Sequence, residues 1–320
     1  MISLTRKEIE SLIDLPKTVQ ALESAYRASS HGNVNLPPVG HIAFAQGADC
    51  HIKYGHIKGD KVFVIKIATG FPLNSINGLP NGNGLVLVLS AETGQVEAML
   101  HDEMVLTDIR TGLGGAIASR SLARQGSHNV LVAGTGQQAR RQIEAHNAIL
   151  PGSLIFKVWG RDATKAKAVV NELATGIVAT QVDDLETAIR SSDIVITATG
   201  ATAPIIKSDW VQPGTHITAV GADAPGKQEL EIKLISRADI VAVDLVSQCA
   251  DHGEISHASR AGEINTSDLI ELGALLGNSK LGRANADQIT IADLTGIAAQ
   301  DIAIAKAVLE TLQGQTHSNG

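Results

Sequence analysis

The sequence contains very few aromatic residues and cysteines. Phenylalanine, tyrosine and tryptophan together make up 2% of its 320 residues, so the core must be built from Val, Ile, Leu and Ala, as in most α/β sheets. The two cysteines, Cys50 and Cys249, are too few for a disulfide framework and lack metal-ligand spacing. This scarcity indicates a reducing compartment.

Long apolar runs and basic runs are missing as well. No apolar stretch approaches the roughly 18 residues that a membrane-spanning helix needs, and the charged segment MISLTRKEIESL is unlike a signal peptide. A net charge of −7 argues against nucleic acid or an anionic membrane as a partner. We therefore expect a cytoplasmic globular protein of two domains, with neither nucleic acid nor membrane among its partners.

One stretch runs from an apolar strand, residues 129–133, directly into a glycine turn and a helix. The turn reads Gly134-Thr-Gly136-Gln137-Gln138-Ala139. In a dinucleotide-binding interpretation, Gly134 makes the tight turn, Gly136 lets the backbone approach a pyrophosphate, and Ala139 keeps the helix close to the strand. The helix, expected over 137–150, would point its first N–H groups at the phosphates.

A glycine turn that serves packing alone is the alternative to this interpretation. The residues that follow favour the cofactor, because short apolar strands and helical segments continue to alternate. They are expected at 155–159, 163–174, 178–181, 193–197, 215–220, 238–245, 268–276 and 289–294, with a last helix over 297–312. This alternation predicts a parallel sheet of the Rossmann type.

The choice between NAD and NADP depends on the end of the second strand. Gly160 occupies the place where an Asp or Glu would accept hydrogen bonds from the ribose of NAD. Arg161 could bind a 2′-phosphate through two parallel hydrogen bonds, whereas Asp162 keeps NAD possible. The sequence therefore favours NADP(H), with NAD(H) as the alternative and a solvated turn arginine as the interpretation without a ligand.

The N-terminal part has a different periodicity. Thr5 and Glu8 are spaced as a capping box, and a helical pattern broken near Pro16 follows them. Alternating strands are then expected at 41–45, 50–56, 62–68, 85–90 and 96–100, with a hairpin turn over 91–94. An antiparallel sheet should therefore precede the nucleotide-binding part, and a helix rich in small residues, 106–125, should lead into it.

Several stretches together resemble the ornithine cyclodeaminase/μ-crystallin family. They are Lys66-x3-Gly70-x-Pro72-x-Asn74, Leu106-Thr-x2-Arg110-Thr111, the glycine motif, Ala219-Val-Gly-x-Asp223-x2-Gly226-Lys227 and Asp293-x-Thr295-Gly296-x4-Gln300-Asp301. The resemblance implies an α/β fold, with a Rossmann-type doubly wound sheet over 116–297. It also implies a split α+β domain for substrate binding and dimerisation, formed by 1–115 with 298–320, and hence a homodimer.

Members of the family are NAD(P)-dependent cyclodeaminases, alanine dehydrogenases, and reductases of cyclic or open-chain imino acids. Their chemistry needs cations for a carboxylate and a group that moves a proton at nitrogen. The resemblance gives the carboxylate to Arg110 and the acid/base role to Asp223. It places Lys66 in the pocket as a catalytic residue, where it could bind the carboxylate or polarise the imine. A surface arginine, a solvent-facing lysine and a turn-capping aspartate are the alternatives.

Two further positions are expected to bind substrate. Lys53 lies where the ornithine enzyme of the family carries a glutamate, so it would repel a side-chain ammonium and suit a carboxylate or a neutral ring; a solvent-facing Lys53 is the alternative. Asn81 replaces the usual threonine. Ornithine is therefore not the expected substrate. The residues expected at the cofactor are Gly134, Gly136, Gln137, Gln138, Ala139, Arg161, Thr199, Val220 and Thr295.

No metal is expected. His51 with His56, and His252 with Glu254 and His257, do not place two ligands one helical turn apart, and hydride transfer needs no metal. The leading hypothesis is an NAD(P)H-dependent reductase of a small 2-imino acid, such as pyrroline-2-carboxylate or iminosuccinate. A cyclodeaminase that uses bound NAD and a non-catalytic NADPH-dependent binder of small molecules are the alternatives; retention of Lys66 and Asp223 argues against the last.

Overall fold

The computed structural model describes residues 1–318, which divide into two compact units. Unit 1 comprises Met1–Arg110 and the chain from Ile297 onward, and unit 2 comprises Thr111–Gly296. These limits fall close to the domain boundaries expected at 115/116 and 297/298. The role of each unit as an independent substrate-binding or cofactor-binding domain stays a prediction.

Unit 1 contains the expected antiparallel sheet. Among the described residues its strands follow the order β1-β7-β6-β5-β4-β2, and β3 pairs with β4. The strands are β1 (Ile2–Thr5), β2 (Val34–Asn35), β3 (Gly40–Ala43), β4 (Asp49–Ile57), β5 (Val62–Gly70), β6 (Gly82–Ser90) and β7 (Val96–His101). No local pattern indicated β1, which pairs with β7 in parallel and makes the sheet mixed.

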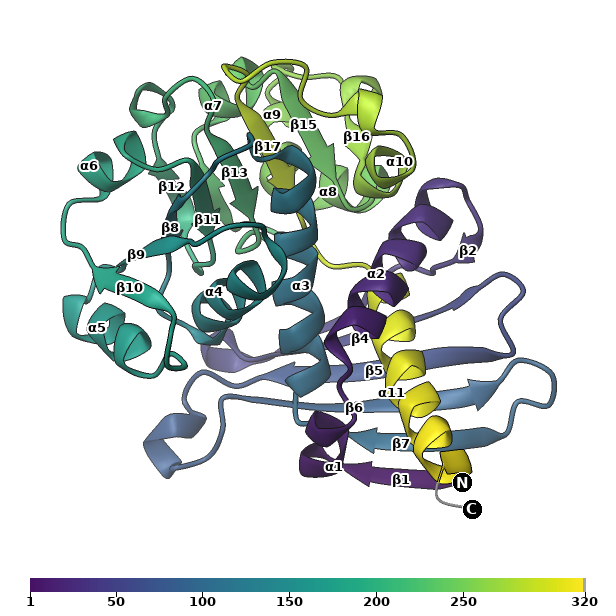
Figure 1. Ribbon diagram of the computed structural model, residues 1–320. Helices are drawn as coiled ribbons and strands as arrows, with labels where there is room; N and C mark the ends of the chain where they lie inside the picture. The colour runs from purple at the N-terminus through teal and green to yellow at the C-terminus, as the bar shows by residue number, and fades with distance from the viewer. Residues whose placement is uncertain (319–320) are drawn as a thin grey trace. The chain divides into compact units, whose positions relative to one another are not determined.

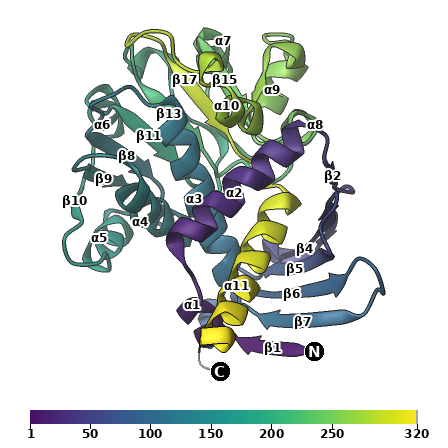
Figure 2. The same ribbon diagram turned by 45° about the vertical axis from the view of Figure 1, so that its right-hand side comes forward.

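Helices cover one face of this sheet. They are α1 (Arg6–Ser11), which begins at the expected Thr5–Glu8 capping box, α2 (Leu15–Ser30) and α11 (Ala298–Ser318). Figures 1 and 2 show α11 lying across β4 and β5 beside α2. Strand residues of even number, such as Val64, Val86 and Val88, are buried beneath α11 together with Ile302 and Ile304.

The odd-numbered residues of β5, β6 and β7 form the opposite face of the sheet, together with the even-numbered residues of β4 that pair with them. Tyr54, Ile65, Leu87 and Met99 are cross-strand neighbours in one row of this face, and each is at least partly exposed. The remaining large apolar side chains of the face are Ile52, Phe63, Ile67, Leu85 and Leu89. A sheet face this apolar and this open is typical of a surface that packs against another protein chain.

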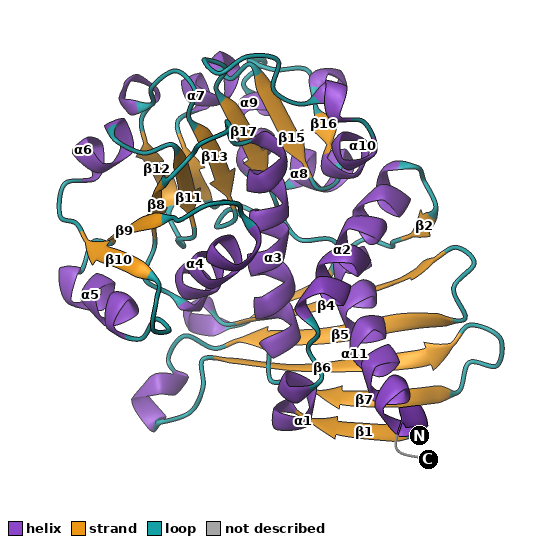
Figure 3. Cartoon of the chain, viewed as in Figure 1, coloured by secondary structure: helices purple, strands orange, loops and turns teal. Residues whose placement is uncertain are grey.

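Unit 2 is a parallel α/β unit. Its described strands pair in parallel in the order β10-β9-β8-β11-β13-β17-β15-β16 (Figure 3). They are β8 (Asn129–Ala133), β9 (Ile155–Trp159), β10 (Val178–Gln181), β11 (Ile194–Thr197), β13 (His216–Ala219), β15 (Ile240–Val243), β16 (Ile270–Glu271) and β17 (Thr290–Asp293). The order reverses between β8 and β11, which is the position where doubly wound sheets bind ligands. The predicted Rossmann-type fold class is confirmed.

Helices connect these strands, as parallel pairing requires. The expected ones are α3 (Val105–Leu122), α4 (Gln137–Ile149), α5 (Ala163–Asn171) and α10 (Leu272–Gly277). The last begins later than expected, because Ile270 and Glu271 pair with β15 as a strand. Sequence reasoning missed α6 (Leu185–Arg190), α7 (Ile232–Arg237), α8 (Val246–Asp251), α9 (Glu254–Arg260) and the small sheet of β12 (Thr202–Ile206) with β14 (Gln228–Leu230).

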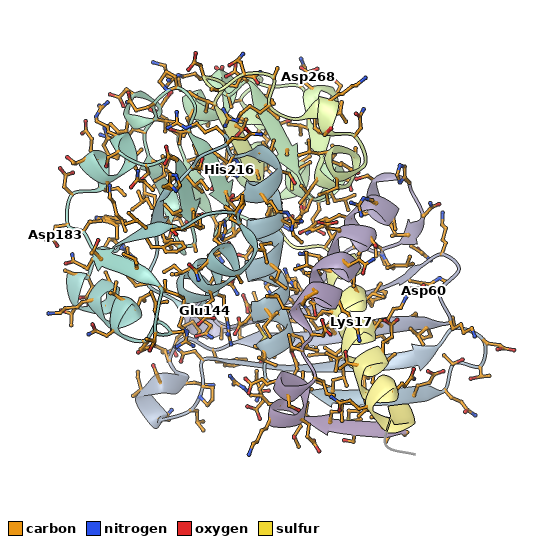
Figure 4. The ribbon with its side chains drawn as sticks, in the orientation of Figure 1. Lys17, Asp60, Glu144, Asp183, His216 and Asp268 are labelled. Atoms are coloured by element: carbon orange, nitrogen blue, oxygen red, sulfur yellow. The ribbon has the colours of Figure 1, made fainter. Side chains whose placement is uncertain are left out.

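A buried polar chain crosses the core of unit 2. His216 lies inside the unit, as Figure 4 shows, with Nδ1 2.9 Å from Thr290 Oγ1 and Nε2 2.9 Å from Thr218 Oγ1. Burial lowers the pKa of His216 to about 3, so its imidazole is neutral and suited to these hydroxyl partners. Its hydrogen bonds account for this histidine without a catalytic role. Among residues 1–318, no helix has the length and apolar character needed to cross a membrane.

Candidate active site

Three charged side chains meet in the interior of unit 1. The alternation of β5 places Lys66 on the sheet face covered by α11, where Lys66 Nζ donates to Asp301 Oδ1 at 2.9 Å. Arg110 Nε donates to the same oxygen at 3.1 Å. The three residues are 2%, 5% and 3% exposed, for Lys66, Arg110 and Asp301 respectively. Lys66 is therefore not a solvent-facing strand residue, and Arg110 is not a surface arginine.

Burial and charge act in opposite directions within this cluster. Burial lowers the pKa of Lys66, repulsion from Arg110 and Lys53 lowers it further, and attraction to Asp301 only partly opposes them. Burial alone would raise the pKa of Asp301, but the surrounding cations hold it below its usual range. Asp301 is therefore ionised at neutral pH, whereas Lys66 gives up its proton more readily than an ordinary lysine does.

A second buried acid lies near Lys66. Asp102 is 1% exposed, accepts a hydrogen bond from the Leu106 N–H at 3.2 Å, and has its pKa raised to about 6 by burial. Asp102 Oδ1 and Asp301 Oδ2 are buried acceptors without a hydrogen-bond donor among the described residues. Unit 1 thus contains both cations and unused acceptors at one place, as a site for an amino or imino acid needs.

Lys53 lies beside this cluster and Asn81 does not. Lys53 is the direct cross-strand neighbour of Lys66 and is half-buried, so both side chains are on the same face of the sheet. Asn81 is exposed, and its Oδ1 accepts a hydrogen bond from the Ser75 N–H at 2.9 Å within the turn that precedes β6. Substrate binding by Asn81 stays a prediction that these contacts do not support.

Unit 2 contains a cleft of about 520 Å³ at the C-terminal ends of β8, β9 and β11. Gly134 has a φ of +149°, and a Cβ there would lie 2.5 Å from the Ala198 carbonyl oxygen, so only glycine fits. A Cβ on Gly136 would meet no atom within 4 Å. Gly136 therefore leaves open space in front of the N-terminus of α4, where a pyrophosphate would bind.

The charged residues after β9 lie where the ribose of a dinucleotide would bind. Asp162 caps α5, and its Oδ1 accepts hydrogen bonds from the Thr164 and Lys165 N–H groups at 2.9 and 3.3 Å. Arg161 and Lys165 are exposed and both line the cleft. Sequence reasoning missed Lys165, although its place in the first turn after a capping aspartate could have indicated it. The cleft therefore presents two cations, while the nearby carboxylate is used by the helix cap.

Some of the residues expected at the cofactor line the cleft and others do not. Thr199 lines the cleft, as do Gly134, Gly136 and Arg161. Gln137, Gln138, Ala139, Val220 and Thr295 lie outside its lining. Thr295 is buried, and its hydroxyl donates to Asp244 at 3.1 Å. A cofactor role for these five stays a prediction.

A buried glutamate that sequence reasoning missed holds the rim of the cleft. Glu229 Oε1 accepts from the Thr199 N–H at 2.7 Å, and Oε2 accepts from the Gly221 N–H at 3.0 Å. Burial raises the pKa of Glu229 above its usual range, although these donors oppose the shift. Its carboxylate joins the chain segments that follow β11 and β13. The sequence around Glu229 is polar, with Gln228 before it and Glu231 after it, so no local pattern indicated a buried acid.

Asp223 follows β13 in unit 2, whereas Lys66 and Arg110 belong to unit 1. Its carboxylate is exposed and forms an ion pair with Lys227 at 2.5 Å. The motif residue Lys227 is therefore the direct charge partner of Asp223. The position of Asp223 beyond the C-terminal end of a parallel strand is the one expected for a residue that acts on a ligand.

The chain is similar to known proteins over nearly its whole length. The model of the ornithine cyclodeaminase/mu-crystallin family matches residues 1–316. A protein of Rhizobium meliloti (strain 1021), named as a dehydrogenase without a stated substrate, is 38% identical over 94% of this chain and 93% of its own. Two solved structures cover 99% of this chain. An archaeal alanine dehydrogenase dimer with bound NAD has a TM-score of 0.90 at 34% identity, with 97% of its chain covered. Thermococcus litoralis Δ1-pyrroline-2-carboxylate reductase with NADH and L-proline has a TM-score of 0.91 at 26% identity, with 98% covered.

The buried ion cluster yields a prediction about stability. Asp301→Asn removes the negative charge that accepts hydrogen bonds from both Lys66 and Arg110. Arg110 then stays buried without this anionic partner, and Lys66 can keep its proton only against its desolvation cost. We expect the free energy of unfolding, measured by urea denaturation, to fall by about 3–5 kcal/mol. The pKa of Lys66 should fall further, because the attraction that raises it is lost.

Glu10→Gln is the matched control. It removes the exposed pair of Glu10 with Arg6 in the same unit, which should cost less than about 1 kcal/mol. Equal losses in the two variants would show that the buried cluster does not depend on Asp301.

Proposed function

Because the chain belongs to the ornithine cyclodeaminase/mu-crystallin family, we propose that it is an NAD(P)H-dependent reductase that converts a small 2-imino acid into the L-amino acid. The observation that carries this proposal is the buried cluster of Lys66, Arg110 and Asp301. Cations held in the interior suit a substrate carboxylate, and burial strengthens their attraction for it. The dinucleotide cleft of unit 2 supports hydride transfer as the reaction.

The residues then have separate tasks. When bound, the nicotinamide cofactor supplies the hydride that adds to the imine carbon. Arg110 contacts Asp301 through Nε, which leaves its Nη groups to bind the substrate carboxylate together with Lys66. Asp223 donates the proton that the imine nitrogen gains. One hydride and one proton convert the C=N bond into the amine, so the reaction balances.

A cyclodeaminase is the second candidate within the family. Lys53 argues against a diamino acid as its substrate, because this half-buried cation lies on the face of the sheet that carries Lys66. A side-chain ammonium bound near it would be repelled. A non-catalytic binder of small molecules is the third candidate, and the presence of both Lys66 and Asp223 argues against it.

One assay separates the three candidates. The protein is incubated with NADPH or NADH and a panel of imino acids that includes pyrroline-2-carboxylate and iminosuccinate. Net cofactor oxidation supports the reductase; ammonia release from a diamino acid without net cofactor change supports the cyclodeaminase; neither supports the binder. In the reductase, Asp223→Asn should lower kcat by about 10²–10⁴-fold with nearly unchanged cofactor affinity. Full activity in this variant would show that a group other than Asp223 donates the proton.

We further propose that NADPH is preferred over NADH. Arg161 and Lys165 line the cleft, and Asp162 is engaged in capping α5. A 2′-phosphate could therefore bind two cations at the place where the ribose hydroxyls of NAD would need a carboxylate as hydrogen-bond acceptor. Both cations are exposed, so we expect the gain in binding free energy for NADPH to lie at the lower end of the range for charge-assisted hydrogen bonds.

Arg161→Ala tests the cofactor preference. We expect the Kd of NADPH to rise about tenfold and the Kd of NADH to stay nearly constant. Lys167→Ala is the control, since Lys167 is an exposed lysine of α5 outside the lining of the cleft. Fluorescence titration of both cofactors gives the four constants, and equal affinity of the wild type for NADPH and NADH would contradict the proposal.

A homodimer is the proposed assembly, supported by the open apolar face of the unit 1 sheet. Ile65→Glu places a charge in the middle of that face, in the row with Tyr54, Leu87 and Met99. We expect the dimer of the wild type to become a monomer in light scattering coupled to size exclusion. Lys61→Glu, a charge reversal at an exposed turn, should leave the mass unchanged. If the Ile65→Glu variant remained dimeric, the dimer interface would lie on another surface.

A further inference from the structure

Three potential ligands gather on the hairpin of β3 and β4, outside the residues used above. His41 lies directly opposite His51 in the antiparallel register, and Asp49 precedes His51 by two residues, so all three side chains share one face. Their ligand atoms all lie within 4.8 Å of one another. The two imidazole rings stack with centroids 4.6 Å apart, and His51 Nδ1 is 3.8 Å from Asp49 Oδ1.

The neighbouring strand leaves room for this group. Asp49 lies opposite Gly70 and His51 lies opposite Ala68. A Cβ on Gly70 would be 2.8 Å from Asp49 Oδ1, so the missing side chain gives the carboxylate its place. Small residues at both positions keep β5 from filling the space above the three ligands.

We propose that His41, Asp49 and His51 bind a divalent transition metal ion such as Zn²⁺. Two imidazoles and one carboxylate form a ligand set that this ion accepts, with a further position open to water. Mg²⁺ and Ca²⁺ prefer sets of oxygen ligands, so they should bind poorly. Donors about 2.1 Å from a tetrahedral ion lie roughly 3–4 Å apart. The exposed His41 ring must therefore turn out of its stacked position on His51 before both imidazoles can bind one ion.

This site differs from the histidine combinations that the sequence suggested. His51 and His56 point to opposite faces of β4, and His56 Nε2 is 2.8 Å from the Asp60 carbonyl oxygen. The partner of His51 is instead His41, which only the register of the hairpin reveals. The proposal is independent of the reductase activity, because hydride transfer needs no metal.

Lys53 sets a limit on the affinity. It lies two residues beyond His51 on the same face of β4, so its positive charge opposes that of a bound ion. Asp49 offsets part of this repulsion. The site should therefore bind more weakly than a closed structural zinc site with four protein ligands.

Calorimetric titration of the metal-free, untagged protein with Zn²⁺ tests the proposal. We expect about one equivalent per chain near pH 7.5 and no heat with Mg²⁺. Co²⁺ should give visible absorption bands from histidine and carboxylate ligation. His41→Ala and Asp49→Asn should each weaken Zn²⁺ binding at least tenfold.

The controls are His56→Ala and Cys50→Ser, which remove the nearest other potential ligands on β4 and should leave the titration unchanged. His41 is exposed, so its variant should keep the far-ultraviolet circular dichroism of the wild type. Absence of Zn²⁺ binding in the wild type, undiminished binding in both ligand variants, or loss of binding in Cys50→Ser would each overturn the assignment.

Discussion

Asp301 on α11 accepts hydrogen bonds from Lys66 on β5 and from Arg110 on α3 through a single buried oxygen. Two buried cations and one buried anion are tolerable only as a group, because each charge left alone would carry an uncompensated desolvation penalty. The adjacent Gln300 donates through Nε2 to Tyr26 Oη at 2.7 Å and to the Arg110 carbonyl oxygen at 3.2 Å. Polar contacts therefore join the end of the chain to strands and helices from its beginning, which explains why unit 1 is split.

The same cluster changes what can be concluded about the substrate. Lys53, Lys66 and Arg110 alone would suggest a substrate with two carboxylates, since one carboxylate can bond well to only one or two cations. Asp301 already supplies one negative charge, and Asp102 can supply a second when it is ionised. A single carboxylate of the proposed substrate would then be enough as a further partner for Lys66 and Arg110. The charge of the site is therefore as compatible with a neutral cyclic imine as with a dicarboxylic imino acid.

Local patterns in the sequence predicted most of the fold, and contacts between distant segments account for what was missed. The alternation in β4 to β7 and the glycine motif after β8 each act over a few residues, so they could be recognised directly. The strand β1 exists only because β7 pairs with it, and Asp301 meets Lys66 from 235 positions away. Asp162 caps α5 through Oδ1 and also lines the cleft, so NAD(H) stays possible beside NADP(H).

Glu229 connects the two functions expected of unit 2. Its carboxylate accepts hydrogen bonds from the Thr199 N–H at the cofactor cleft and from the Gly221 N–H, two residues before Asp223. A Cβ at Gly221 would lie 2.4 Å from both Glu229 Oε2 and the Thr199 carbonyl oxygen, so the two segments approach as closely as their backbones permit. Any movement of one segment must therefore break a buried hydrogen bond to the other or carry it along. The Glu229 carboxylate therefore fixes the segment at the cleft and the segment that leads to Asp223 in one arrangement.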